Sequence, residues 1–208
     1  MIARLTLVVA LAGCYSFPTM GRAHVVEHRH LEVWAAPLAL VVATPGGDGQ
    51  EAGGSVRPLV EVGARYGASD RIELDARAGT FGFGAGTRIQ LLRSANIDVL
   101  VAPGLAFTLP NKPALELPVV AGWNFGRHQL IASVRGVYQQ KWGVGGVDGP
   151  LHFAYLGGSL GFAWQIWEHV AVMPELALLT ELWSPPGFTS ELPNAVGIQA
   201  GIGFLWDR

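Results

Sequence analysis

Hydrophobic residues alternate with small or charged residues along most of the chain between residues 59 and 206. The stretch 71–78 shows the pattern most simply, because Ile72 and Leu74 lie on one side of the alternation and Glu73 and Asp75 on the other. Successive side chains of a β-strand point to opposite faces, so a period of two predicts strands with one apolar and one polar face. We therefore expect an all-β protein.

The alternation divides into ten predicted strands, at residues 31–43, 58–67, 71–79, 81–92, 96–107, 114–125, 128–140, 151–166, 169–181 and 195–206. The first is the weakest, because Pro37 and the apolar run 38–43 blur its pattern. Eight strands, or twelve if this segment splits, are the alternatives. Pro103, Pro118 and Pro174 fall inside predicted strands. Each removes a hydrogen-bond donor, so we expect β-bulges or register shifts at these three positions.

The predicted connections alternate in length along the chain. Short turns are expected at residues 67–70, 93–95, 126–127 and 167–168, and longer loops rich in glycine and proline at 44–57, 108–113, 141–150 and 182–194. Only the connection 79–81 is short where a long loop is expected. Outer-membrane barrels have an even number of strands, short periplasmic turns and longer external loops. The pattern therefore predicts a closed antiparallel up-and-down transmembrane β-barrel with both termini in the periplasm.

The two faces of the predicted strands differ in the size of their side chains. The polar register includes many small residues, such as Gly82, Gly84 and Gly86, whereas the apolar register carries large side chains such as Leu115 and Leu117. Glycine weakens a strand, and a surface in contact with water gives no steric reason for it. A narrow lumen does give such a reason. We therefore expect the apolar face to point outward to lipid; the alternative is a soluble barrel with an apolar interior.

Aromatic residues gather near the ends of the predicted strands. Near the periplasmic ends we expect Tyr66, Trp123, Phe125, Trp164, Trp167, Phe204 and Trp206, and near the external ends Phe81, Phe83, Phe107, Tyr138, Trp142 and Trp183. Tyrosine and tryptophan are enriched at both membrane–water interfaces, and transmembrane barrels carry two aromatic girdles. The distribution supports the same membrane-spanning barrel.

Composition agrees with this interpretation and excludes some partners. Charged residues make up 14% of the chain and hydrophobic residues 50%, whereas soluble domains contain about 25% charged residues. Lys112 and Lys141 are the only lysines. The net charge of -2 gives no electrostatic basis for binding nucleic acid. A chain of 208 residues suits one domain, and we expect a monomer in contact with outer-membrane lipid.

The N-terminal residues differ from the rest of the chain. Arg4 precedes a short apolar run at 5–11, and Leu11-Ala12-Gly13-Cys14 follows. This arrangement resembles a bacterial lipoprotein signal, in which small residues precede an invariant cysteine that is lipidated; an ordinary secretory signal is the alternative. The resemblance implies removal of a signal peptide at 1–13 and lipid attachment at Cys14, and Tyr15 favours sorting to the outer membrane. We assign residues 14–30 to a polar tether and residues 31–208 to the barrel.

Ten charged residues fall in the register expected to face the lumen: Glu61, Arg65, Glu73, Asp75, Arg77, Arg88, Asp98, Glu116, Arg135 and Glu175. Their signs nearly balance. An isolated buried ion costs several kcal/mol, so such charges persist in a narrow lumen only when paired or hydrated. We expect a plug of salt bridges, with Arg77 paired to Glu73 or Asp75 on its own strand and face. A polar conduit or ligand site is the alternative.

Candidates for catalysis or metal binding are weak. Histidines 24, 28 and 30 are close in sequence, but neither a cysteine nor a regular helix supports a defined metal site there. His128 and Ser133 are five residues apart, which places them on opposite faces of a strand, and no G-x-S-x-G motif is present. We therefore expect neither catalytic residues nor a metal nor a cofactor.

Taken together, residues 31–208 resemble small bacterial outer-membrane β-barrels of the OmpA/OmpX-like or OmpW-like kind. The last strand alternates correctly through Phe204 and Trp206, but Asp207 and Arg208 follow, whereas family members end on an aromatic residue. The resemblance implies a non-enzymatic barrel with a polar lumen filled by side chains. Its role would be structural, surface-interacting or a minor one in permeability, with surface or periplasmic partners. A lipid-anchored barrel that carries a small apolar ligand is the alternative function.

Overall fold

The computed structural model describes residues 20–44, 53–80, 82–108, 112–142, 149–185 and 196–207. The predicted signal peptide, Cys14, Phe81 and parts of the predicted loops lie outside these residues. All regular secondary structure in the described ranges is β-strand. In this part of the chain no helix is long and apolar enough to cross a membrane.

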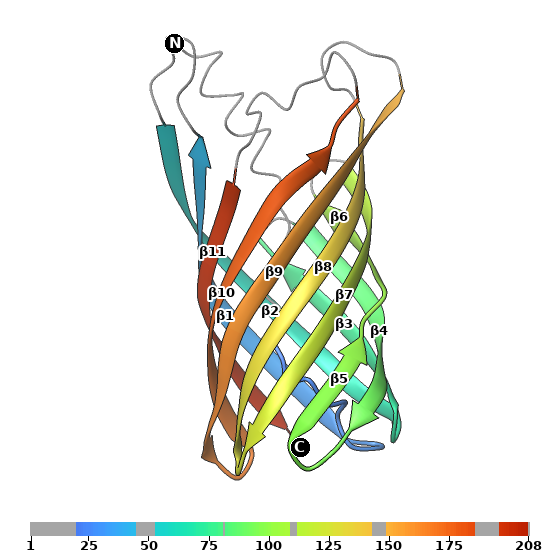
Figure 1. Cartoon of the computed structure of the whole chain (residues 1–208), viewed down its shortest axis with the longest axis vertical. Helices are drawn as coiled ribbons and strands as arrows, with labels where there is room; N and C mark the ends of the chain where they lie inside the picture. The colour runs from blue at the N-terminus through green and yellow to red at the C-terminus, as the bar shows by residue number, and fades with distance from the viewer. Residues whose placement is uncertain are drawn as a thin grey trace.

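The strands form one antiparallel sheet that closes on itself (Figure 1). They are β1 Leu31–Thr44, β2 Gly53–Ser69, β3 Ile72–Gly79, β4 Gly82–Arg93, β5 Ile97–Val101, β6 Gly104–Thr108, β7 Lys112–Phe125, β8 His128–Trp142, β9 Pro150–Trp167, β10 Val170–Trp183 and β11 Val196–Asp207. Strands β5 and β6 share one position between β4 and β7. The last strand pairs with the first along Glu32↔Asp207 to Ala43↔Val196. The predicted ten-stranded barrel is confirmed, and neither eight nor twelve strand positions occur.

The ends of the barrel differ in their connections. The short turns β2–β3, β4–β5, β7–β8 and β9–β10 lie at one end, here called the turn end, together with the C-terminus (Figure 1). The opposite end, here called the loop end, carries the longer connections after β1, β8 and β10 and the short connection between β3 and β4. Strand β2 begins five residues before its predicted start, so the first loop is shorter than expected.

The bulges and register shifts expected at Pro103, Pro118 and Pro174 are wrong. The pairs Pro118↔Arg135 and Pro174↔Ile202 keep the register of their neighbours. At Pro103 the register is also constant, but the hydrogen-bond ladder is interrupted, which divides the strand into β5 and β6.

At Pro103 and Pro118 the reason is that the proline still accepts a hydrogen bond through its carbonyl group. Ala102 N–H donates to Pro118 O at 2.9 Å, and Thr87 N–H donates to Pro103 O at 3.0 Å. Only the return bond is lost, because proline has no N–H. Register shifts occur instead between Gly67 and Ser69, Gln90 and Leu92, Val170 and Ala171, and Glu181 and Trp183. All four are close to strand ends, where fewer ladder bonds oppose an extra residue.

Alternate side chains point out of the barrel and into it. On β7 the outward residues Leu115, Leu117 and Val119 are 45–55% exposed, and the inward residues Glu116 and Val120 are buried. The apolar register therefore points outward, as predicted. The lumen is not purely polar, however, because it also holds an apolar group that includes Trp34, Leu38, Leu40, Leu59, Leu100, Val120, Ile131 and Leu179.

Candidate functional site: the occupied lumen

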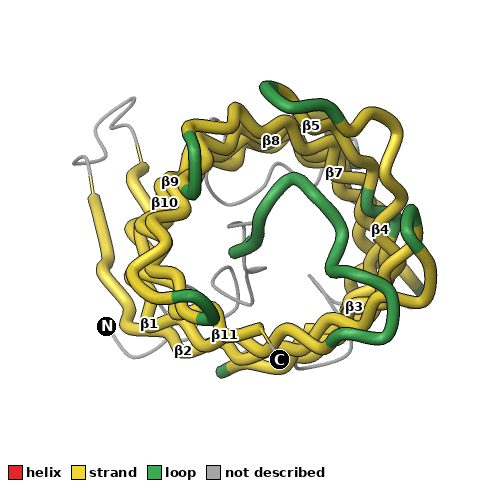
Figure 2. The backbone as a smooth tube through the Cα atoms, turned by 90° about the horizontal axis from the view of Figure 1, so that it is seen from below, coloured by secondary structure: helices red, strands yellow, loops and turns green. Residues whose placement is uncertain are grey.

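Residues 20–30, here called the inner segment, cross the turn end of the barrel: residues 20–26 lie inside the lumen, and the exposed residues 27–30 lie beside the wall. Figure 2, which looks into this end, shows them as a loop that crosses the interior of the ring. Met20, Ala23 and Val25 have no exposed surface. The sequence analysis assigned these residues to a polar tether between anchor and barrel, so their place in the lumen is a difference from that assignment.

The inner segment joins the wall beside Gly67 on β2. Arg29 N–H donates to Gly67 O at 2.8 Å, and Gly67 N–H donates to His30 O at 3.1 Å. A Cβ atom at position 67 would overlap the backbone oxygen of Glu27. Glycine is therefore required here for the close approach of the two backbones.

The wall binds the inner segment through its main chain. Four side chains accept hydrogen bonds from backbone N–H groups: Glu175 Oε2 from Met20 at 2.9 Å, Gln129 Oε1 from Ala23 at 2.7 Å, Gln90 Oε1 from Val25 at 2.8 Å, and Glu73 Oε2 from Val26 at 2.7 Å. Three others donate to its carbonyl groups: Arg65 Nη2 to Met20 at 2.8 Å, Arg88 Nη2 to Arg22, and Gln90 Nε2 to Ala23 at 3.2 Å. Six wall residues thus satisfy buried peptide groups that would otherwise be costly.

Four of the ten charged residues that were predicted to face the lumen form one cluster with Glu32, here called the turn-end cluster. Arg65 Nη1 lies 2.6 Å from Glu32 Oε1, and Arg65 Nε lies 3.4 Å from Asp75 Oδ2 and 3.5 Å from Glu73 Oε1. Arg88 Nη1 lies 2.9 Å from Glu73 Oε1. The cluster comprises Glu32, Arg65, Glu73, Asp75 and Arg88, and it also holds the inner segment through Arg65, Glu73 and Arg88.

Three further charges form a second cluster, the mid-lumen cluster of Arg77, Glu116 and Arg135. Arg77 Nη2 lies 2.5 Å from both carboxylate oxygens of Glu116, and Arg135 Nη1 lies 3.7 Å from Glu116 Oε2. The expectation that Arg77 pairs with Glu73 or Asp75 is wrong, because Arg77 donates its hydrogen bonds to Glu116. Glu73 lies four residues from Arg77 along β3, about 13 Å away and beyond the reach of its side chain, whereas β7, three strand positions away around the barrel, presents Glu116 to Arg77.

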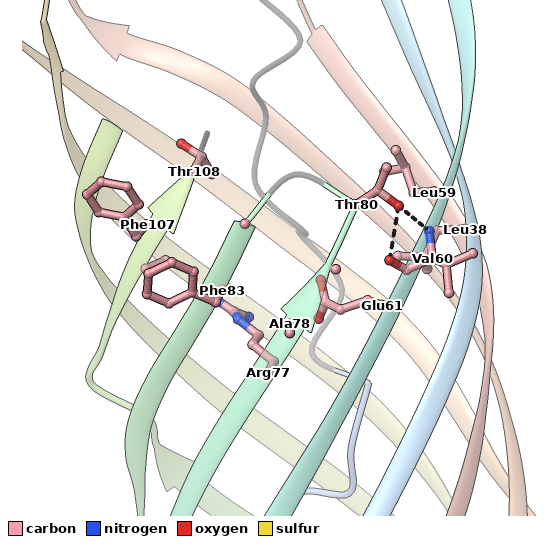
Figure 3. A pocket seen from close by; sticks show the side chains of 13 residues that line it. Leu38, Leu59, Val60, Glu61, Arg77, Ala78, Thr80, Phe83, Phe107 and Thr108 are labelled. Carbon is pink, nitrogen blue, oxygen red and sulfur yellow. Dashed lines mark hydrogen bonds between the residues drawn. The ribbon is translucent and has the colours of Figure 1, made fainter. Parts of the chain in front are cut away.

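Glu61 lies beside the mid-lumen cluster. Figure 3 shows its carboxylate and the Arg77 guanidinium lining one pocket between β2, β3 and β4. This pocket and a second one beside Arg65, Arg77 and Arg135 each have a volume of about 40 Å³. Such spaces hold a few water molecules rather than an organic ligand. The described lumen is therefore closely filled at this level.

Asp98 and Glu175 lie apart from the two clusters. Asp98 Oδ2 accepts hydrogen bonds from Asn124 at 3.0 Å and from Gln129 at 3.1 Å, and His24 Nδ1 of the inner segment lies 3.8 Å from it. Glu175 accepts the Met20 N–H. All ten predicted lumen charges thus point inward; eight are buried, and Asp75 and Arg77 are 19% and 16% exposed at the side chain.

Sequence reasoning missed the partners of the inner segment. Gln90 and Gln129 occupy the inward register, so alternation alone could have placed them in the lumen. The signal for the segment itself was weaker: Met20, Ala23 and Val25 are apolar residues within a stretch otherwise taken as polar.

The described residues show neither a nucleophile–base pair nor a metal cluster. Ser133 and Ser159 hydrogen-bond each other at 2.7 Å inside the barrel, while His152 Nδ1 lies 2.5 Å from Tyr138 Oη on the outside. His128 Nδ1 accepts the Gln165 N–H at 3.3 Å. Across the described ranges, no group of three His, Cys, Asp or Glu side chains is arranged to hold a metal ion.

The outer surface is apolar between two sets of exposed aromatic residues. At the turn end Trp123, Trp164 and Trp206 are 53–56% exposed, and at the loop end Phe83 and Trp142 are 60% and 52% exposed. Aliphatic side chains cover the strands between them. Water strongly disfavours such a surface, whereas lipid does not. The fold is that of an outer-membrane β-barrel.

Similarity between this chain and known proteins is found in structure alone. No family model matches the chain, and no curated protein matches it. Among solved structures, it is similar to the outer-membrane protease OmpT from Escherichia coli, with 7% identity and a TM-score of 0.47 over 86% of this chain and 96% of that one. It is also similar to Neisserial surface protein A (10% identity, TM-score 0.41, 85% and 96% covered) and to OprG from Pseudomonas aeruginosa (14%, 0.38, 90% and 99%). At these identities the likeness concerns the fold alone.

Proposed function

We propose that this chain is a non-enzymatic barrel of the bacterial outer membrane, that its lumen is closed to solutes, and that it serves through its surface. The observation that carries the proposal is the inner segment, because six wall residues hold its main chain across the turn end of the lumen. The orientation follows the general rule for such barrels, with short turns and both termini in the periplasm and longer loops outside.

Two successive layers support a closed lumen. At the turn end, a solute would have to displace a segment whose peptide groups are bonded to the wall. At mid-height it would have to separate Arg77 from Glu116, and removing one partner of a buried ion pair costs about 3–5 kcal/mol. A lumen of ten strands is wider than one of eight, which side chains alone can fill. The inner segment supplies the additional volume.

The surface role falls to the loop end. The connections after β1, β8 and β10 are the longer ones there, and loops on a rigid scaffold commonly carry the contacts of a protein. The lumen gives little support to the alternative of a carrier for a small apolar ligand. Two pockets in the lumen have volumes of about 40 Å³ and are lined partly by charged groups. A pocket of about 510 Å³ at the turn end is lined mainly by polar and charged residues, among them Arg22, His24 and Gln129, which does not suit an apolar ligand.

The test is conductance in planar lipid bilayers. The wild type should give no stable current steps. A double variant, Gln90→Leu with Gln129→Leu, removes three hydrogen bonds to the inner segment and should produce small, irregular steps as the segment loosens.

The matched control is Gln139→Leu. Gln139 is also buried and inward, but its amide donates to Thr108 Oγ1 at 3.2 Å on the wall itself. It should behave as the wild type. Stable, porin-sized steps in most insertions of the wild type would refute a closed lumen.

A further inference from the structure

A groove of about 520 Å³ lies on the outer surface near the loop end, over β4, β6, β7 and β8. Outward side chains form its sides and floor, among them Phe83, Leu105, Phe107, Pro113, Leu115 and Tyr138. Leu105 and Leu115 are 64% and 55% exposed. The groove therefore opens away from the lumen, to whatever surrounds the barrel.

The strand register explains why the surface is hollow at this place. Phe83 pairs with Phe107, and Phe107 with Pro113, in one row across three strands. The Phe83 and Phe107 rings stack with their centroids 5.5 Å apart. In the next row Ala85 pairs with Leu105. The side chains of Ala85 and Pro113 are short, and larger side chains surround them. The rings of Phe83 and Phe107 and the side chains of Leu105 and Leu115 therefore form the walls of the groove.

The chemistry of the lining favours a flexible apolar occupant. No charged side chain lines the groove, and Gln140 is the one lining residue with a side-chain amide. Beside it, on the side of β8 and β9, Tyr138 Oη and His152 Nδ1 lie 2.5 Å apart. The groove thus has an apolar floor and a polar margin along one side, as a single hydrocarbon chain with a polar head requires.

The groove is continuous with the surface that faces lipid. Leu117 and Val119 follow Leu115 on the outward face of β7 and are 54% and 45% exposed. We propose that the groove binds one acyl chain of a membrane lipid, with the polar head of that lipid beside Gln140, Tyr138 and His152. This inference rests on the proposed location in the membrane and adds to it a defined lipid site.

The experiment uses the full-length protein in nanodiscs of phosphatidylethanolamine and phosphatidylglycerol that contain a phospholipid with a diazirine on its acyl chain. After illumination, peptide mass spectrometry maps the lipid adducts. Adducts should concentrate on residues 105–117 relative to the opposite wall at residues 196–204. Ala85→Trp fills the groove and should reduce these adducts about tenfold, the equilibrium effect of about two buried methylene groups.

Ala200→Trp is the matched control, because Ala200 is an exposed outward alanine of β11 on the opposite wall. It should leave the adducts at 105–117 unchanged. Both variants must retain the heat-dependent gel shift of a folded barrel. An even distribution of adducts around the wild-type barrel would overturn the lipid site but leave the membrane location intact. No adducts on any strand would overturn the membrane location itself. Crosslinked dimers through this face, without adducts in it, would identify a second copy as the occupant and also overturn the proposal.

Discussion

Replacing Arg77 with alanine should destabilise the barrel by an amount that follows from its contacts. Arg77 makes two bonds of 2.5 Å to Glu116, whose side chain is only 4% exposed. Loss of one partner of a buried pair costs about 3–5 kcal/mol, because the other charge stays buried. The loss of stability for Arg77→Ala should lie at the lower end of this range, about 3 kcal/mol. The side chain of Arg77 is already 16% exposed, and Arg135 Nη1 remains 3.7 Å from Glu116 Oε2.

The assay is the temperature at which the folded barrel loses its faster migration on a gel run without boiling. For a chain of this size, 1 kcal/mol corresponds to roughly 2–4 °C, so Arg77→Ala should lower that temperature by roughly 6–12 °C. Arg71→Ala, at an exposed arginine in the β2–β3 turn, is the control and should change it little.

A double-mutant cycle identifies the cause of the loss. Glu116→Gln removes the stranded charge, so Arg77→Ala in that background should cost much less than in the wild type. Additive effects of the two substitutions, or an unaltered melting temperature for Arg77→Ala, would refute the argument. In either case the mid-lumen charges would be hydrated independently, as in the wall of an open channel.

Three further predictions concern the inner segment, the anchor and the membrane. Gly67→Val places side-chain atoms against Glu27 O, and a forced overlap of this kind costs about 1–3 kcal/mol. With a cysteine introduced at Ala23 in a Cys14→Ser background, Gly67→Val should therefore raise the rate of thiol labelling about tenfold. Gly136→Ala is the control and should leave that rate unchanged, because an added Cβ there meets nothing within 4 Å. Radioactive palmitate should label the wild type but not Cys14→Ser, and equal labelling would end the claim of a lipid anchor. The Cys14→Ser form, given a cleavable signal peptide, should resist carbonate extraction from membranes; release as a soluble β-protein would mean that the outward surface does not contact lipid.

The barrel could be predicted from the sequence because its dominant signal is local. A period of two along β3 and β7 fixes which side chains share a face, and the positions of short turns fix which strands are neighbours. Glycines such as Gly84 and Gly86 indicate the inward face, and a Cβ atom there would lie 3.1 Å from Arg77 Nε and 2.8 Å from the backbone oxygen of Pro103, respectively. These inferences need no knowledge of what lies across the lumen.

What could not be predicted depends on contacts between distant segments. Arg77 meets Glu116 rather than Asp75 as its closest partner because the curved wall brings β7, three strand positions from β3, within reach, and alternation does not encode that distance. The inner segment has no periodic pattern, and the wall side chains that bond to its main chain lie 45 to 155 residues away in sequence. The effect of Pro103 was misjudged for a different reason: loss of one donor interrupts a ladder, but the neighbouring pairs are enough to hold the register.

The way the inner segment is held bears on which of its positions tolerate substitution. Since the wall bonds to peptide groups, replacements at the exposed residues 27–30 should leave docking unchanged, whereas Met20, Ala23 and Val25 are fully buried and should tolerate less. Proline should not be tolerated at residues 20, 23, 25, 26 and 29, where a donated N–H would be lost. Gly21 is also constrained, because a Cβ atom would overlap the Arg65 guanidinium. Selection on this contact should therefore fall on the wall, at Gln90, Gln129 and their charged neighbours, and on the buried positions of the segment, while its exposed residues are left free to diverge.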